Sequence, residues 1–363
     1  MKQSTRTTGF VAGIAWLIGV WLISLLVSLP AAVAEEPNAA TKAPSVQLMN
    51  PAAELWRDVR QRTVPSSGNT QVKGVDSGVL INTNGDRWRH FRMNQLIPIG
   101  GYVLGGALLA LLLFYMIRGR VPVEGGLSDR KLLRYSNYER TIHWFIAGVF
   151  IFLGLSGLIL LFGRPLLIPL IGKEAFSVLA SASKEGHNLM GPVFLISLIL
   201  IFVRFVRRNI YQKGDLTWLL RGGGVIGKKH VPSNFFNMGE KTMFWLLVFV
   251  GGTIIVSGFV LVSPSLGHPR EWMELAHVGH AIGAVLMITV IFGHIYIGTV
   301  GMEGAIEGMK TGYCDLNWAK EHHDLWASQA EKNSEALPND EVARLRGDFD
   351  RLPRDVSIEE AGK

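Results

Sequence analysis

Two histidines lie fourteen residues apart in one apolar segment, His280-AIGAVLMITVIFG-His294. Ionisable side chains inside such a segment are costly in a bilayer and need a partner. In a helix that rises about 1.5 Å and turns about 100° per residue, the two rings lie about 21 Å apart along the axis and about 40° apart around it. That spacing suits the axial ligands of two stacked haems. The alternative is two buried histidines bonded to backbone carbonyls.

The composition is that of an all-α integral membrane protein. Mean hydropathy is +0.27, and long apolar runs predict helices that span a bilayer. Five spans are expected, at about 96–117, 143–162, 189–203, 243–262 and 277–300. Ahead of them, basic residues, an apolar run and the stretch Pro30-Ala-Ala-Val-Ala34 predict a signal peptide over residues 1–34. An uncleaved anchor is the alternative.

Loop charge predicts an orientation in the membrane. Lysine and arginine are enriched in cytoplasmic loops, and here they concentrate in residues 118–142 and 204–241 rather than in 164–188 and 263–276. We therefore expect a bacterial inner-membrane protein with residues 35–95 in the periplasm and a cytoplasmic tail, 303–363. Within the exported segment, Asn84-Gly85 predicts a β-hairpin turn between two short strands. The charged tail is expected to be helical in part and otherwise flexible.

Depth in the membrane pairs the histidines. With the predicted orientation, His187 and His280 share the outer level, whereas His143 and His294 share the inner level. Two bis-histidine sites are therefore expected, and bis-imidazole coordination suits electron transfer better than oxygen or substrate chemistry. The single cysteine, Cys314, excludes a covalent C-x-x-C-H haem site and a cysteine-ligated iron–sulfur cluster within this chain.

Other polar residues have less specific roles. His277 would lie about 100° around the helix from His294, compared with about 40° for His280, so we assign His277 to the surface. Arg140 and Arg204 lie at cytoplasmic helix ends, where they would pair with haem propionates or simply anchor the helices. The remaining histidines fall in loops or tails and are expected to be solvated: His90, His230, His268, His322 and His323.

A set of motifs follows Tyr138. They are Glu139-Arg-Thr-Ile-His143-Trp144, Phe202-Val-Arg-Phe-Val-Arg-Arg-Asn-Ile210, Asn237-Met-Gly-Glu-Lys241 before Met243-Phe-Trp245, His294-Ile-Tyr296, Gly304-Ala-Ile-Glu-Gly-Met309 and Trp318-Ala-Lys-Glu-His-His323. In these motifs the chain resembles the cytochrome b (gamma) subunits of respiratory membrane-bound formate dehydrogenases. The resemblance implies a four-helix di-haem cytochrome b bundle over 118–302, preceded here by an extra transmembrane helix at 96–117.

The resemblance also implies functional roles. Positions that match the family's haem ligands are His143, His187, His280 and His294, and a quinone would be lined by Asn237 and Gly239. A molybdopterin or tungstopterin alpha subunit would oxidise formate and an iron–sulfur beta subunit would deliver electrons to the outer haem. The inner haem would then reduce ubiquinone or menaquinone near the cytoplasmic face. This chain would transfer electrons without oxidising formate. Asn237 has an alternative role as a helix N-cap.

Other classes of function stay open at this point. Cytochrome b subunits of nickel–iron hydrogenases and thiosulfate reductases are also di-haem quinone modules. A haem-free membrane anchor or a metal-ion transporter would use the histidines differently, but transporters usually carry acidic residues within their spans, and these span interiors have no Asp or Glu. The net charge of +7 follows membrane topology, and nucleic acid is not expected as a partner.

Overall fold

A computed structural model describes residues 83–221 and 231–347 of the chain. The described residues fall into two units, one that ends at Pro98 and one that begins at Ile99. The described part of the first unit consists of α3 (Thr83–Phe91), a π-helical segment, η1 (Arg92–Leu96), and the first two residues of the helix that follows. The predicted signal peptide and most of the predicted exported segment lie outside the described residues.

The predicted β-hairpin is wrong, because Asn84 and Gly85 both belong to α3. An acidic residue in the first turn of α3, Asp86, and a basic residue in its last turn, Arg89, complement the helix dipole. An Asn-Gly pair turns a hairpin when strands flank it, and here the residues that follow are helical as far as Arg118.

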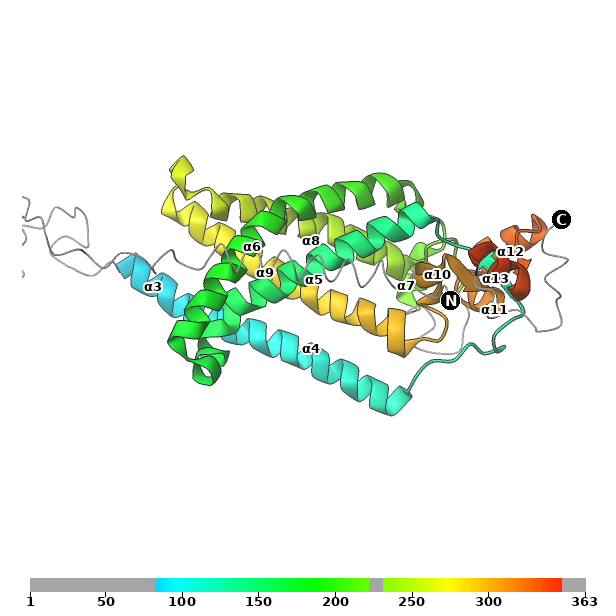
Figure 1. Cartoon of the computed structure of the whole chain (residues 1–363), viewed down its shortest axis with the longest axis horizontal. Helices are drawn as coiled ribbons and strands as arrows, with labels where there is room; N and C mark the ends of the chain where they lie inside the picture. The colour runs from blue at the N-terminus through cyan, green and yellow to red at the C-terminus, as the bar shows by residue number, and fades with distance from the viewer. Residues whose placement is uncertain (1–82, 222–230, 348–363) are drawn as a thin grey trace, which may run out of the picture. The chain divides into compact units, whose positions relative to one another are not determined.

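Within residues 83–221 and 231–347, five helices are long and apolar enough to cross a membrane, as predicted. Their cores are α4 (Ile97–Arg118), α5 (Asn137–Leu166), α6 (Ile168–Phe205), α8 (Met238–Val262) and α9 (Arg270–Tyr296). Contacts run from α5 to α6, from α6 to α8, from α8 to α9 and from α9 back to α5, so these four helices close into a bundle (Figure 1).

The core of this bundle is apolar, and so is much of its outside. Buried core residues include Val149 on α5, Met190 and Phe194 on α6, and Phe244 on α8. Large apolar side chains also lie exposed on the outer faces, for example Val256, which is 67% exposed. Helices that are apolar all round suit a hydrocarbon solvent. The chain is therefore a multi-pass membrane protein.

Helices α5 and α8 begin with the same N-terminal capping motif. At the start of α5, Ser136 Oγ accepts from the Glu139 backbone N–H and the Glu139 carboxylate accepts from Ser136 N–H at 2.8 Å. At the start of α8, Asn237 and Glu240 form the same reciprocal pair, both bonds at 3.0 Å. Such capping boxes satisfy N–H groups that a helix start leaves unpaired. Each fixes where the chain enters the bundle.

Helix α6 is longer than expected. The sequence predicts a connecting loop over 164–188, but α6 begins at Ile168 and bends at Gly172, whose φ is +81°. The residues after the bend are mostly good helix formers, among them Lys173, Glu174 and Ala175. Polar residues therefore ended the apolar run in the sequence without ending the helix.

Residues 303–347 of the tail are helical in part, as predicted, but the segments between their helices include two strands of a sheet rather than flexible chain. The tail's strands β2 (Tyr313–Asp315) and β3 (Leu337–Pro338) pair antiparallel with β1 (Arg130–Leu133), in the order β2-β1-β3. Four short helices complete it: α10 (Glu307–Thr311), α11 (Leu316–His322), α12 (Asp324–Lys332) and α13 (Asn339–Arg346). The remaining short elements are η2 (Val206–Asn209), α7 (Asp215–Leu220), η4 (Pro264–Leu266) and η5 (Ile297–Gly301).

One buried arginine joins the tail to the bundle. Arg134 is 4% exposed, pairs with Glu240 of α8 at 2.8 Å, and lies 4.8 Å from the ring centroid of Trp318 in the tail. His323 is 1% exposed and its Nδ1 lies 2.9 Å from the Asn234 carbonyl oxygen. The expectation that His323 is solvated is therefore wrong. Burial, with the charge of Arg134, lowers the pKa of His323 well below its ordinary value.

Candidate functional site

Four histidines from three helices form two facing pairs. His143 of α5 faces His294 of α9 with ring centroids 6.1 Å apart, and we call this the 143–294 pair. His187 of α6 faces His280 of α9 at 6.0 Å, and we call this the 187–280 pair. Because α9 is helical through both positions, its two rings lie about 21 Å apart along the axis. The structure thus brings together the residues that the sequence paired by depth.

The spacing within each pair fits one metal ion between two imidazoles. With bonds of about 2 Å to each nitrogen, the ring centroids of two such ligands would lie about 6 Å apart. Within residues 83–221 and 231–347, no group of three or more His, Cys, Asp or Glu side chains could hold a metal ion. Each pair would therefore supply two ligands to a metal ion whose remaining donors come from another group, as haem would supply.

Serines on the neighbouring helices orient the rings of the 187–280 pair. Ser156 Oγ lies 2.9 Å from His187 Nδ1, and Ser257 Oγ lies 3.2 Å from His280 Nδ1, which is also 2.9 Å from the Ile254 carbonyl oxygen. Each serine hydroxyl donates to a carbonyl of its own helix, so it meets the ring as an acceptor. Nδ1 then carries the proton, and the Nε2 lone pair is left for a metal.

A glycine follows each of these serines, and because it has no Cβ, it leaves room for the neighbouring imidazole ring. A Cβ on Gly157 would lie 3.3 Å from His187 Cε1, and a Cβ on Gly258 would lie 3.2 Å from His280 Cε1. Both distances are tighter than ordinary carbon contacts of about 3.5–4.0 Å. Ser156-Gly157 and Ser257-Gly258 thus form a matched cradle around the pair, with one dipeptide from α5 and one from α8.

The 143–294 pair has a different surrounding. His143 Nδ1 is buried and has no hydrogen-bond partner, an arrangement that costs about 1–3 kcal/mol in the absence of a ligand or water. The neighbouring Trp144 ring packs edge-on at 5.1 Å, and Trp144 Nε1 donates to the Met309 carbonyl at 3.1 Å. Helix α10 of the tail therefore helps to set the position of this ring. The two facing imidazoles, with ring centroids 6.1 Å apart, would admit one metal ion between them.

The residues expected to contact a quinone lie at the start of α8. Asn237 Oδ1 accepts from the Glu240 N–H at 3.0 Å, so its alternative role as an N-cap is confirmed. The cap leaves the amide nitrogen to donate elsewhere. A Cβ on Gly239 would lie 2.9 Å from Trp218 Cη2, so the indole of α7 covers this glycine. Trp218 forms an aromatic wall that the sequence did not point out.

Protein groups hold both arginines that were considered for haem propionates. Arg140 Nε donates to the Met309 carbonyl at 3.1 Å, and its Nη1 donates to Asn137 Oδ1 at 3.1 Å. Arg204 Nη2 pairs with the buried Glu139 carboxylate at 2.9 Å. These protein partners are enough to hold the side chains of Arg140 and Arg204 where they lie. Contact between either arginine and a haem propionate stays a prediction.

The other histidines do not join the pairs. His277 lies half-buried on α9, while His90 lies exposed on α3. His268 and His322 are partly exposed. His230 lies outside the described residues.

Comparison with known proteins shows which family this bundle is similar to. Residues 134–312, which include all four paired histidines, match the family model described as prokaryotic cytochrome b561. This segment is therefore similar to a family of membrane cytochromes of the b type.

Curated relatives narrow the resemblance. The cytochrome b556(Fdn) subunit of the nitrate-inducible formate dehydrogenase of Escherichia coli (strain K12) is 29% identical over 210 residues, covering 56% of this chain and 94% of the relative. The cytochrome b556(fdo) subunit from the same strain is 28% identical, with 56% and 95% covered. The formate dehydrogenase cytochrome b556 subunit of Haemophilus influenzae is 24% identical over 229 residues, with 60% and 92% covered. The predicted resemblance to formate dehydrogenase cytochrome b subunits is confirmed.

Ser156, Ser257 and Gly258 are site residues that sequence reasoning missed. Each stands inside an apolar run, as Ser156-Gly157-Leu158 in one span and Ser257-Gly258-Phe259 in another. A serine within a hydrocarbon-spanning helix needs a hydrogen-bond partner, and the recurrence of Ser-Gly in two spans was a signal available in the sequence.

Proposed function

We propose that this chain is the membrane cytochrome b subunit of a formate dehydrogenase complex, and that it relays electrons from an iron–sulfur subunit to quinone. Two facing histidine pairs at two levels of one closed bundle carry the proposal. Two b-type haems would supply one-electron carriers at these pairs. The similar cytochrome b556 subunits, which are named for formate dehydrogenases, support formate as the source of electrons.

Charge in the loops supports the direction of the relay. Residues 118–142 and 204–241 precede the starts of α5 and α8, and both are rich in lysine and arginine. The 143–294 pair would then lie toward the cytoplasm of a bacterial inner membrane, with the tail on the same side. Residues 35–95 would be exported behind a signal peptide over 1–34. Electrons would enter at the 187–280 pair and leave at the 143–294 pair.

The start of α8 offers a place for the quinone. It lies at the same end of the bundle as the start of α5, which carries His143 (Figure 1). The Asn237 amide nitrogen would donate to a quinone carbonyl, and the Trp218 ring over Gly239 would supply an apolar wall. Protons for quinone reduction would come from the cytoplasmic side, where the loop residues reach water.

The proposal is tested on the complex purified intact with its partner subunits. A pyridine haemochrome assay should give about two protohaems per copy of this chain, as expected for two bis-histidine sites. Formate should reduce both, and added quinone should reoxidise them. Reduction by hydrogen gas but not by formate would favour a hydrogenase partner. A folded preparation without haem would contradict the electron-relay function itself and favour a membrane anchor.

A further inference from the structure

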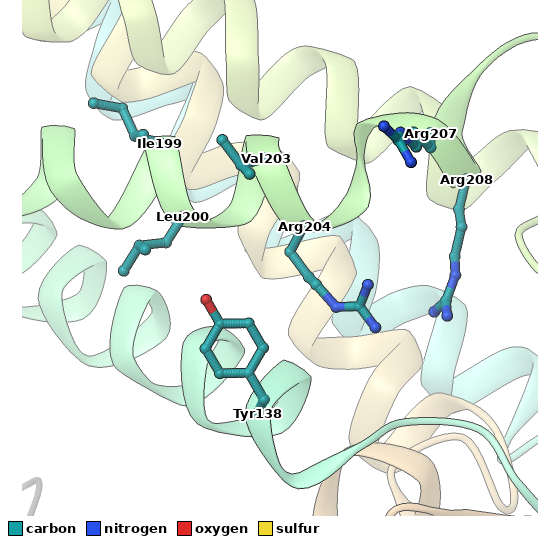
Figure 2. Close-up of a pocket in the computed structure, with 7 residues that line it drawn as sticks. All are labelled: Tyr138, Ile199, Leu200, Val203, Arg204, Arg207 and Arg208. Carbon is teal, nitrogen blue, oxygen red and sulfur yellow. The ribbon is translucent and has the colours of Figure 1, made fainter.

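A cavity of about 560 Å³ lies between the start of α5 and the end of α6 (Figure 2). Tyr138 of α5 lines one side, and three aliphatic side chains of α6 line the other, followed by Arg204, Arg207 and Arg208. We call this cavity the α5–α6 groove. It joins an apolar section within a membrane-spanning helix to a cluster of arginines at the end of that helix.

The groove opens away from the histidine pairs. Tyr138 lies five residues before His143, which places the two about 140° apart around α5, and Val203 lies about 160° around α6 from His187. Tyr138 is 58% exposed and Val203 is 69% exposed, so both face the surroundings of the bundle. Tyr138 and Val203 therefore place the opening of the groove on faces of α5 and α6 that point away from the histidine pairs.

The arginines at the groove are held in place by one buried carboxylate. Glu139 is 2% exposed, and its Oε1 pairs with Arg204 Nη2 at 2.9 Å and with Arg208 Nη1 at 2.7 Å. Both arginine side chains remain 37% exposed, and each guanidinium has five N–H donors, more than its pair with Glu139 uses. Arg207 also lines the groove, so three arginines and the one carboxylate that pairs with two of them give this region a net charge of two positive units.

We propose that the α5–α6 groove binds an anionic phospholipid of the surrounding bilayer. Guanidinium groups bind phosphate oxygens through paired N–H donors, and basic pockets between helix ends recognise anionic headgroups. The phosphodiester binds between the fixed arginines, and an acyl chain lies along Ile199, Leu200 and Val203 (Figure 2). Tyr138 occupies the interfacial level where tyrosine is enriched. This inference is independent of the electron-relay function.

Lipid binding is measured on the purified full-length protein by native mass spectrometry, with phosphatidylglycerol and phosphatidylcholine as probes. The wild type should retain phosphatidylglycerol in preference to phosphatidylcholine. Arg207→Gln leaves the Glu139 pairs intact and should lower that preference about fivefold, the effect of one basic residue at an anionic surface. Arg118→Gln, an exposed arginine at the end of α4, is the matched charge control and should leave the preference unchanged.

A steric pair of variants tests the apolar section. Val203→Trp fills the groove and should reduce phosphatidylglycerol retention, whereas Leu155→Trp, at an equally lipid-facing position that is 60% exposed, should not. Three results would overturn the proposal: no preference for phosphatidylglycerol in the wild type, equal losses in Arg207→Gln and Arg118→Gln, or retention unchanged in Val203→Trp. Competition by inorganic phosphate at equal concentration would assign the site to a free anion and overturn the lipid.

Discussion

Substituting Gly258 by alanine should weaken haem binding at the 187–280 pair. The new Cβ would lie 3.2 Å from His280 Cε1, whereas carbon atoms settle at about 3.5–4.0 Å. The ring would therefore have to move by about 0.3–0.8 Å. Metal-ligand distances tolerate only about 0.2 Å, so the displaced imidazole cannot keep its bond without a further change. A loss of haem affinity of about 10- to 100-fold is expected, comparable with the loss of an orienting partner.

The assay is titration of the purified protein with haem, followed by the low-spin absorption bands and by pyridine haemochrome. Gly157→Ala should act in the same way, because its Cβ would lie 3.3 Å from His187 Cε1. Gly105→Ala is the matched control, since its Cβ would meet nothing within 4 Å. Retention of two haems with unchanged bands and affinity in both Gly258→Ala and Gly157→Ala would refute the cradle argument.

Three further predictions concern other parts of the fold. Lys241→Met should lower the free energy of unfolding by about 3–5 kcal/mol, because it leaves Asp215, which pairs with Lys241 at 2.7 Å, buried without its cation. Chemical unfolding should show this loss, and the double variant that adds Asp215→Leu should recover much of the stability. Purely additive losses in the double variant would contradict the pairing. Asn237→Ala should lower stability by about 1 kcal/mol through the loss of the helix N-cap, and it should slow quinone reduction. Asn237→Ser should keep the cap and still slow quinone reduction. A normal rate of quinone reduction in Asn237→Ser would exclude a quinone contact by Asn237. Burial raises the pKa of Cys314 to about 11 from 9.0, so the folded tail holds a proton that the unfolded tail releases, and its stability should fall as the pH rises from 9 to 11. Cys314→Ala should lack this slope in hydrogen exchange, and an identical slope would contradict the assignment.

The sequence was sufficient for the spans and for the histidine pairing. Apolar runs report membrane crossing directly, because hydrocarbon allows few polar side chains. Helical period then places His280 and His294 on one side of α9, and alternating loop charge orders the other two by depth. These inferences rest on chemistry that acts along the chain, so a single sequence carries them.

Features that depend on contacts distant in sequence were missed. The sheet joins Lys131 to Asp315 and to Leu337, partners from three separate segments that no local pattern links. His323 is buried beside the Trp318 and Trp326 rings and the Asn234 carbonyl, and Asn234 lies 89 residues earlier in the chain. The hairpin expected at Asn84-Gly85 failed for the opposite reason, since a short turn signal was overridden by the helix that contains it.

Replacement of single histidines tests the central claim most directly. Haem is counted by pyridine haemochrome in purified wild type, His280→Ala and His294→Ala, with His277→Ala as the matched control on the same helix. The account predicts two haems in the wild type and in His277→Ala, and one in each of the other two variants. It also predicts that the haem remaining in His280→Ala is the one held by the 143–294 pair. Two low-spin haems in either His280→Ala or His294→Ala would contradict it.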